Sequence, residues 1–314
     1  MKFKKPKFWD LKKPNFFSYL LLPFTIPLLI NNFLLDKKNK KKSDKIKTIC
    51  VGNIYIGGTG KTPTTIKLYE ILNKLEFNTS IGKKIYSSHY DEKMLLEKKA
   101  NLISAKSRKK ILDIAVQNNL DCLIFDDGLQ DKNLSYNLQI VCFDSYDWIG
   151  NGKLIPSGPL REKILSLKKY DAVFLKNTVL VDSNIIDIIK KINPKIKIFE
   201  TKYRILNLNK FNLSDKYLVF SGIGSPTNFN KTLIKEGFNI VEEINFPDHF
   251  DYKKKDIDFI KNRASKLGAK IITTEKDFIK ISDDINESID FLEVNLEIKN
   301  EIDLINFLKL KLYE

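Results

Sequence analysis

The chain has 314 residues and a formal net charge of +15 at pH 7, because 54 Lys and Arg residues stand against 39 Asp and Glu residues. At about 100–200 residues per domain, this length predicts two domains. Apolar residues make up 43% of the chain, and this composition excludes an intrinsically disordered chain, a collagen-like chain and a multi-span membrane protein.

The positive charge is concentrated at the N-terminus. Residues 1–48 contain 13 Lys and 3 Asp, a net charge of +10, and the remaining 266 residues carry the other +5. Between the lysines lies an apolar run at 16–30 that contains Pro23 and Pro27. As a helix this run would reach about 22 Å, which is less than the roughly 30 Å core of a bilayer. We expect residues 1–48 to lie on a membrane surface with their lysines on anionic headgroups; a buried helix and a true span are the alternatives.

The strands and helices expected after this segment form two sets. In the first set, apolar runs predict strands at 47–53, 121–127, 138–143 and 172–175, and helical periodicity predicts helices at 64–75 and 109–117. In the second set, strands are expected at 217–220, 238–243, 270–274 and 291–296, and helices at 228–236, 255–266 and 302–312. Residues 196–216 are expected to be a connector. Alternating helices and buried strands indicate parallel sheets.

Three cysteines lie in the apolar, strand-like runs, at Cys50, Cys122 and Cys142. They have no Cys-x-x-Cys spacing, which argues against a disulfide framework and against a zinc site. We interpret them as buried thiols in a reducing compartment.

The sharpest motif follows the strand at 47–53 and reads Gly57-Gly58-Thr59-Gly60-Lys61-Thr62. Glycines let backbone N–H groups approach phosphate oxygens, the lysine reaches the β- and γ-phosphates, and the threonine hydroxyl binds Mg²⁺. Because Tyr55 stands where the strict pattern has glycine, this is a variant P-loop. We expect these six residues to bind ATP, Lys61 to act in catalysis as well, and Thr62 to hold Mg²⁺; a Gly-rich turn is the alternative.

Two acids, Asp126 and Asp127, end the strand at 121–127 and complete this expectation. A carboxylate at the carboxyl end of a strand can hold Mg²⁺ directly or through water; a turn or cap acid before Gly128 is the alternative. We therefore expect an α/β fold with a P-loop NTPase-type parallel-sheet domain and a second, smaller α/β domain. The expected ranges are 1–46 for an N-terminal segment with a membrane-associated helix, 47–200 for the P-loop domain, 201–298 for the second domain and 299–314 for a C-terminal helix.

Six blocks in order resemble the tetraacyldisaccharide 4'-kinases of lipid A synthesis. They are the P-loop frame Gly52-Asn53-x-x-x-Gly57-Gly58-x-Gly60-Lys61-Thr62-Pro63, then Asp91-Glu92, Asp126-Asp127-Gly128-Leu129-Gln130, Pro156-Ser157-Gly158-Pro159-Leu160-Arg161-Glu162, Phe246-Pro247-Asp248-His249 and Thr274-Glu275-Lys276-Asp277. The resemblance covers about residues 14–280. It implies two α/β domains with the site in the cleft between them, and transfer of the γ-phosphoryl group of ATP to the 4'-hydroxyl of a tetraacylated glucosamine disaccharide 1-phosphate.

The resemblance also implies residue roles. Asp91 becomes the general base and His249 its partner, because a carboxylate can accept the hydroxyl proton while an imidazole orients or relays it. Arg161 could place a cation on the transferred phosphoryl group, and Glu162 a carboxylate near Mg²⁺. The alternatives are a solvated acid for Asp91, a structural or exposed histidine for His249, and an exposed ion pair at a helix start for Arg161-Glu162.

The chain departs from the family pattern in three places. Gly82-Lys83-Lys84-Ile85 replaces the usual Ser-Arg-Gly-Tyr; the segment that follows is shortened, with Tyr90 and Lys93 in place of Gly and Pro beside the acids; and Asp131 replaces a histidine. We interpret His89 as a surface residue that could substitute as a partner of the base. Lys276 and Asp277 are interpreted as either a nucleotide contact or a helix cap, and Ser221-Gly222-Ile223-Gly224 as a tight turn.

The leading hypothesis is thus a lipid kinase on the cytoplasmic face of the bacterial inner membrane, peripheral or monotopic. Its substrate would be a lipid disaccharide, its cofactors ATP and Mg²⁺, and no nucleic acid or obligate protein partner is expected. The alternative is a membrane-associated P-loop switch ATPase. A nucleic-acid-binding protein is a weaker third hypothesis, because the charge clusters beside an apolar run.

Overall fold

An eight-stranded sheet carries the P-loop, and its strands follow the order β14-β9-β8-β7-β2-β5-β3-β4. The computed structural model describes residues 5–36, 41–43, 45–85, 90–131, 133–177, 183–282 and 284–313. The strands are β2 (Lys47–Gly52), β3 (Thr79–Lys84), β4 (Leu102–Ala105), β5 (Cys122–Asp126), β7 (Leu138–Asp144), β8 (Ala172–Lys176), β9 (Lys197–Ile205) and β14 (Val294–Ile298). Every pairing between β4 and β9 along this order is parallel. The expected α/β class with a large parallel sheet is confirmed.

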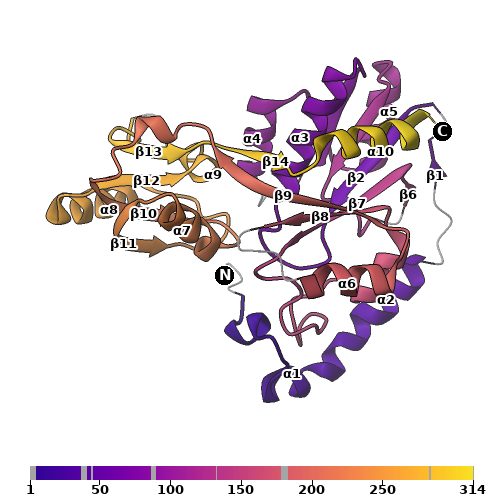
Figure 1. Ribbon diagram of the computed structural model, residues 1–314, viewed down its shortest axis with the longest axis horizontal. Helices are drawn as coiled ribbons and strands as arrows, with labels where there is room; N and C mark the ends of the chain where they lie inside the picture. Colours follow the sequence, from indigo (N-terminus) through magenta and orange to yellow (C-terminus); the bar gives the residue numbers. More distant parts are fainter. Residues whose placement is uncertain are drawn as a thin grey trace. The chain divides into compact units, whose positions relative to one another are not determined.

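Helices cover both faces of this sheet because successive strand residues point to opposite sides. The helices are α3 (Lys61–Lys74), α5 (Arg108–Gln117), α6 (Ser183–Ile192) and α10 (Glu301–Tyr313), with the short 3-10 helix η3 (Ile164–Lys169). On β2, Cys50 packs into the core under α5 and α6, whereas Ile49 and Val51 pack into the core under α3 and α10. Figure 1 shows α6 and α10 on opposite sides of β7 and β8. A small pair of strands, β1 (Lys41–Lys42) and β6 (Leu134–Ser135), lies apart from the main sheet.

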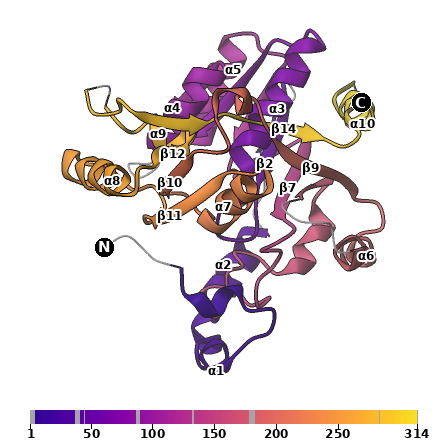
Figure 2. The same cartoon turned by 60° about the vertical axis from the view of Figure 1, so that its left-hand side comes forward.

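A second sheet of four strands has the order β11-β10-β12-β13. Its elements are β10 (Lys216–Ser221), α7 (Pro226–Lys235), β11 (Asn239–Asn245), α8 (Lys254–Leu267), β12 (Lys270–Thr274), α9 (Glu275–Phe278) and β13 (Ile289–Leu292), preceded by η4 (Leu208–Lys210). Its strand pairings are parallel. Leu218 and Phe220 pack towards α8, and Tyr217 and Val219 pack towards α7. The two helices therefore flank β10 (Figure 2).

The described residues divide into two compact units: one comprises those within 5–85, 99–202 and 296–313, and the other comprises those within 90–98 and 203–295. This division differs from the expected ranges. Residues 90–98, which form most of helix α4 (Tyr90–Lys99), fell inside the expected P-loop range of 47–200, but Asp91 pairs with His249 and Lys98 with Glu275 within the smaller unit. The C-terminal helix α10 is not a separate part, because its apolar residues complete the core of the larger unit.

The expected connector at 196–216 is also wrong, because β9 occupies most of its first half. The segment alternates buried and exposed positions, as an edge-proximal strand does, but its charged residues conceal the pattern. Other elements, among them β3, β4, α4 and α6, were not expected either. Strand β4 is only partly buried, so its sequence shows little of the apolar run that marks the central strands.

Residues 7–36, which include the apolar run at 16–30, form several short helices: η1 (Lys7–Asp10), α1 (Phe16–Leu20), η2 (Leu22–Thr25) and α2 (Ile26–Asp36). Asn15 caps α1 through its side-chain oxygen. Pro23 lies in the first turn of η2, where its missing N–H costs no hydrogen bond. Within the described part of the chain, no helix combines the length and the apolar character needed to cross a bilayer. The alternative of a spanning helix therefore has no counterpart among these helices.

Candidate active site

The P-loop is braced by Asn53, which ends the turn after β2. Its amide nitrogen lies 3.0 Å from the Thr59 hydroxyl and 3.3 Å from the Gly57 carbonyl, and its oxygen lies 3.3 Å from Lys61 Nζ. Gly60 precedes α3 with φ +85°, a left-handed conformation that favours glycine. The loop is therefore held open at the N-terminus of a 14-residue helix, where backbone N–H groups can receive phosphate oxygens.

Tyr55, the departure from the strict P-loop pattern, is fully buried. Its hydroxyl donates to Asp10 at 2.8 Å and accepts from Lys5 at 2.9 Å, and its backbone forms a bridge with Leu160. The tyrosine side chain thus joins the P-loop region to Lys5 and Asp10, contacts that glycine could not provide.

Asp126 lies at the carboxyl end of β5 and is almost fully buried. Its Oδ2 accepts hydrogen bonds from Lys83 at 2.5 Å and from the Thr62 hydroxyl at 3.4 Å, and its Oδ1 accepts from the Thr65 hydroxyl at 3.3 Å. Lys83 stands where the family pattern has arginine, so the departure at 82–85 keeps a cation beside this acid. The structure places two of the four expected metal residues, Thr62 and Asp126, within hydrogen-bond distance of each other.

Asp127 adopts a left-handed backbone with φ +55°, and its carboxylate lies between two cations. Oδ2 is 3.3 Å from Lys61 Nζ and Oδ1 is 3.2 Å from Arg161 Nη1. The Asp127 carbonyl accepts a hydrogen bond from the Arg108 guanidinium, which also pairs with Asp131 at 3.0 Å. Sequence reasoning missed Arg108; the one signal that could have found it is the acid at Asp131 in place of the family's histidine.

The Arg161-Glu162 pair is not an exposed ion pair at a helix start, because Glu162 is only 4% exposed. Its Oε1 accepts from the Gln130 amide at 3.0 Å and its Oε2 from the Tyr170 hydroxyl at 3.1 Å. Gln130 also donates to the Asn53 carbonyl at 2.9 Å. Glu162 is thereby tied to the P-loop through Gln130, and both of its carboxylate oxygens have protein donors.

The oxygen donors of this region fit Mg²⁺, which prefers one or two carboxylates together with substrate phosphates. Thr62 Oγ1 and Asp126 Oδ2 lie side by side, and Asp127 follows in sequence. The chemistry of this set, a hydroxyl and two acids after a P-loop strand, is that of a nucleotide-dependent metal site.

Asp91 and His249 form the centre of a second group, in the smaller unit. Asp91 is 3% exposed, and His249 Nδ1 lies 2.8 Å from its Oδ1 and 3.0 Å from its Oδ2. An ionised carboxylate can only accept hydrogen bonds, so Nδ1 carries the proton. Asp91 is therefore not a solvated acid and His249 is not an exposed histidine, whereas the alternative of a structural histidine is compatible with this contact. His89 lies outside the described residues.

Two lysines also face Asp91: Lys276 Nζ lies 3.5 Å and Lys280 Nζ lies 3.7 Å from Oδ2. Burial alone would raise the pKa of the Asp91 carboxyl. The hydrogen bond from His249 and the charges of the two lysines outweigh burial and hold this pKa well below its usual range. Asp91 is therefore ionised at neutral pH. Sequence reasoning missed Lys280, which lies one helical turn after Lys276.

Asp277 lies within α9 and supports this pair; the N-cap residue of α9 is Thr274, whose hydroxyl accepts from the Asp277 N–H, so Asp277 is not the cap itself. Its Oδ2 accepts from the Thr274 hydroxyl at 2.8 Å and from the Gly222 N–H at 2.9 Å, and the Gly222 carbonyl accepts from the His249 N–H at 3.1 Å. The tight turn expected at 221–224 thus connects Asp277 to His249.

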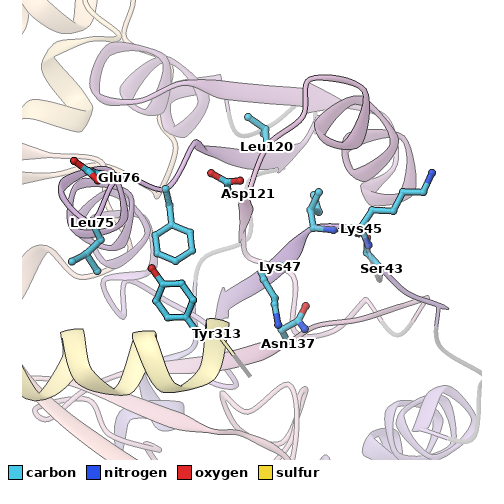
Figure 3. Close-up of a pocket in the computed structure, with 11 residues that line it drawn as sticks. Ser43, Lys45, Lys47, Leu75, Glu76, Leu120, Asp121, Asn137 and Tyr313 are labelled. Atoms are coloured by element: carbon cyan, nitrogen blue, oxygen red, sulfur yellow. Dashed lines mark hydrogen bonds between the residues drawn. The ribbon is translucent and has the colours of Figure 1, made fainter.

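A cavity of about 610 Å³ lies elsewhere, at the amino ends of β2 and β5. Figure 3 shows Lys47, Asp121 and Asn137 around it, with Tyr313 from α10. The P-loop follows the carboxyl end of β2, whereas this cavity lies at the amino ends of the strands. None of the candidate residues lines it.

The parallel sheet carries a P-loop, the Thr62–Asp126 pair follows it, and Asp91 supplies a separate ionised acid. This fold and these residues define a P-loop phosphotransferase. The family model of the tetraacyldisaccharide-1-P 4'-kinases, LpxK, matches residues 20–313. A tetraacyldisaccharide 4'-kinase of Pelagibacter ubique (strain HTCC1062) is 48% identical over 307 residues, covering 98% of this chain and 97% of the relative. That of Rickettsia akari (strain Hartford) is 33% identical, covering 96% and 95%. The chain belongs to the tetraacyldisaccharide-1-P 4'-kinase family.

One solved structure has the same fold over nearly the whole chain. The crystal structure of LpxK from Aquifex aeolicus in complex with ATP gives a TM-score of 0.68 at 23% identity, covering 94% of this chain and 99% of that one.

Proposed function

We propose that this chain transfers the γ-phosphoryl group of ATP to the 4'-hydroxyl of a tetraacyldisaccharide 1-phosphate. The observation that carries the proposal is the buried, ionised Asp91 held by His249 in a chain that also has a P-loop before α3. Membership of the 4'-kinase family supports the choice of acceptor. Phosphoryl transfer needs mainly positioning and neutralisation of charge, and the site is built from residues that supply both.

The P-loop residues Gly57 to Thr62 bind the triphosphate through backbone N–H groups, and Lys61 reaches the β- and γ-phosphates. Arg161 and Lys61 flank Asp127 and give two cations to the charge that develops on the transferred group. Thr62, Asp126 and Asp127 would hold Mg²⁺, with Glu162 in support. Bound there, the ion neutralises the phosphate oxygens.

Asp91 accepts the proton of the acceptor hydroxyl as the hydroxyl oxygen bonds to the γ-phosphorus. The bond from that phosphorus to the β,γ-bridging oxygen breaks, and ADP leaves with the electron pair. His249 keeps Asp91 oriented by donating through Nδ1. The alternative interpretation, a switch ATPase on the membrane, has no use for a buried acid–imidazole pair of this kind.

The kinase works on the inner-membrane surface, at its cytoplasmic face, where both ATP and the lipid are accessible. Large apolar side chains project from the short N-terminal helices, and Phe16 is 74% and Phe24 66% exposed. Exposed aromatic and aliphatic side chains next to a lysine-rich sequence suit insertion among acyl chains with lysines on phosphates.

The direct test incubates the full chain with γ-labelled ATP, Mg²⁺ and the disaccharide lipid in detergent micelles. The expected product is labelled lipid from the wild type and none from Lys61→Ala or Asp91→Asn. The switch interpretation predicts instead released phosphate and nucleotide-dependent dimers without labelled lipid. Protein that binds ATP by calorimetry but forms no labelled lipid would contradict the kinase proposal.

A further inference from the structure

The loop at 149–161 is paired directly with the P-loop strand end. The Arg161 N–H donates to the Ile54 carbonyl at 2.7 Å, and the Ile56 N–H donates to the Pro159 carbonyl at 2.9 Å. These bonds place Arg161 beside the nucleotide site through its own backbone. Any displacement of the 149–161 loop therefore displaces the Arg161 guanidinium relative to Lys61 and Asp127.

The same loop is held from the other side by the N-terminal segment, defined here as residues 5–36. The Asn32 side chain of α2 donates to the carbonyl of Arg161 itself at 3.0 Å. Trp9 Nε1 donates to the Pro156 carbonyl at 3.0 Å, and Trp9 is only 1% exposed. The backbone is tied as well, because the Asn151 N–H donates to the Trp9 carbonyl at 2.9 Å.

Asn151 is the centre of these contacts and is buried. Its amide nitrogen lies 2.9 Å from the Ser18 hydroxyl, 3.0 Å from the Ser157 carbonyl and 3.3 Å from the Phe8 carbonyl. The Ser157 hydroxyl in turn donates to the Ser18 carbonyl. A Cβ at Gly158 would lie 2.1 Å from Asn151 Oδ1, so the loop leaves no room for a side chain there.

The N-terminal segment thus has two different faces. On α2, Leu28 and Leu29 pack with Tyr55, Leu154 and Leu160. Ile30, Phe33 and Leu34 on the same helix are exposed. One face packs against the core of the P-loop unit, and the other exposes apolar side chains. A segment that only anchored the protein would not need its inner face to contact the site.

We infer that the N-terminal segment is a positioning element of the phosphoryl-transfer site, and that Asn32 is the residue through which it fixes Arg161. The inference rests on the role proposed above for Arg161. The membrane-binding segment and the catalytic cation then belong to one rigid set of contacts, so the segment contributes to kcat independently of its contribution to membrane binding.

The test compares Asn32→Leu with Asn31→Leu, since Asn31 is the exposed neighbour on the same helix. Lipid kinase rates are measured in detergent micelles, where membrane binding is not required, and ATP affinity by calorimetry. We expect Asn32→Leu to lower kcat about three- to tenfold, the effect of one lost hydrogen bond, with little change in the Kd for ATP. Asn31→Leu should have the wild-type rate. Trp9→Phe, which keeps an aromatic side chain but removes the indole N–H donor, should also lower kcat.

A double-mutant cycle separates this inference from a general loss of structure. If Asn32 acts through Arg161, adding Asn32→Leu to Arg161→Ala should cause no further loss of kcat. Equal kcat values for Asn32→Leu and Asn31→Leu, or full additivity with Arg161→Ala, would overturn the inference. A wild-type rate in Arg161→Ala alone would instead refute the role proposed for Arg161, and absence of lipid kinase activity in the wild type would refute the proposed function.

Discussion

His249 Nδ1 lies 2.8 Å from Asp91 Oδ1, although 157 residues separate the two in the chain. His249 adopts a left-handed backbone conformation, φ +56°, and its backbone N–H donates to the Gly222 carbonyl. Non-glycine residues in this conformation are uncommon and concentrate at functional sites. The contact makes Asp91 an acid whose orientation and charge are both fixed before a substrate arrives.

Replacing Asp91 by Asn should remove the proton acceptor while keeping the shape of the side chain. We expect kcat for lipid phosphorylation to fall at least about 100-fold, the usual contribution of a general base, with the Kd for ATP unchanged. Asp251→Asn, at an exposed acid of the same unit, is the matched control and should keep the wild-type rate. If Asp91→Asn retains most of the wild-type kcat, another residue is the general base.

Removing the positive charge of Lys276 should change the pH profile. This charge, with those of His249 and Lys280, lowers the pKa of Asp91, so Lys276→Met raises that pKa. The ionised base is then lost at a higher pH, and the acid limb of kcat/KM should move upward on the pH axis. Lys255→Met, at an exposed lysine on α8, should leave the limb in place. Two results would contradict the role of Lys276 in lowering the pKa of Asp91. One is an equal shift of the acid limb in both variants, and the other is a shift to lower pH in Lys276→Met.

The effects of substitutions at Gly52 and Leu129 on the stability of the fold should be coupled. A Cβ at Gly52 would lie 2.6 Å from Leu129 Cγ, and its nearest neighbours all belong to Leu129. Gly52→Ala should therefore destabilise the fold by about 1–3 kcal/mol through overpacking. Leu129→Ala creates a cavity and is destabilising alone, but it also removes the clash. Denaturant melts of both single variants and the double variant should give a double-variant loss smaller than the sum of the single losses; simple additivity would argue against the contact.

Membrane binding should depend on the exposed side chains of the N-terminal segment. Replacing Phe16 and Phe24 together by Ser should weaken co-sedimentation with vesicles that contain anionic lipid, because two inserted aromatic side chains are lost. Phe259→Ser, at an equally large exposed residue on α8, should bind like the wild type. If the double variant binds vesicles as well as the wild type, the membrane-binding surface lies elsewhere on the chain.

Much of the larger unit could be predicted from sequence because its signals are local. A buried strand, a glycine loop with Lys61 and a periodic helix occur within 30 residues, and β5 ends in the two expected acids. The observed β2 and α3 begin or end within three residues of the expected ranges. Among the strands that were missed, charged residues interrupt the apolar run of β9, whereas β4 is short and only partly buried.

The partners of the site residues could not be predicted in the same way, because they depend on contacts between distant segments. The sequence does not show that Lys83 pairs with Asp126, that Arg108 supports Asp127, or that Glu162 is buried against Tyr170. The Asp91–His249 pair was expected only through the resemblance to a family. Nothing local in the shortened segment before Asp91 indicates that α4 belongs with residues 203–295.

The three cysteines have a consequence for handling the protein. All are fully buried, and burial raises the pKa of the thiols of Cys122 and Cys142 to about 12. Only the thiolate reacts readily with alkylating reagents, so the native chain should be nearly inert towards them. Each thiol becomes reactive when its core opens, and all three lie in the sheet that carries the P-loop. Alkylation rates followed by mass spectrometry would therefore report how often that sheet opens, without any engineered probe.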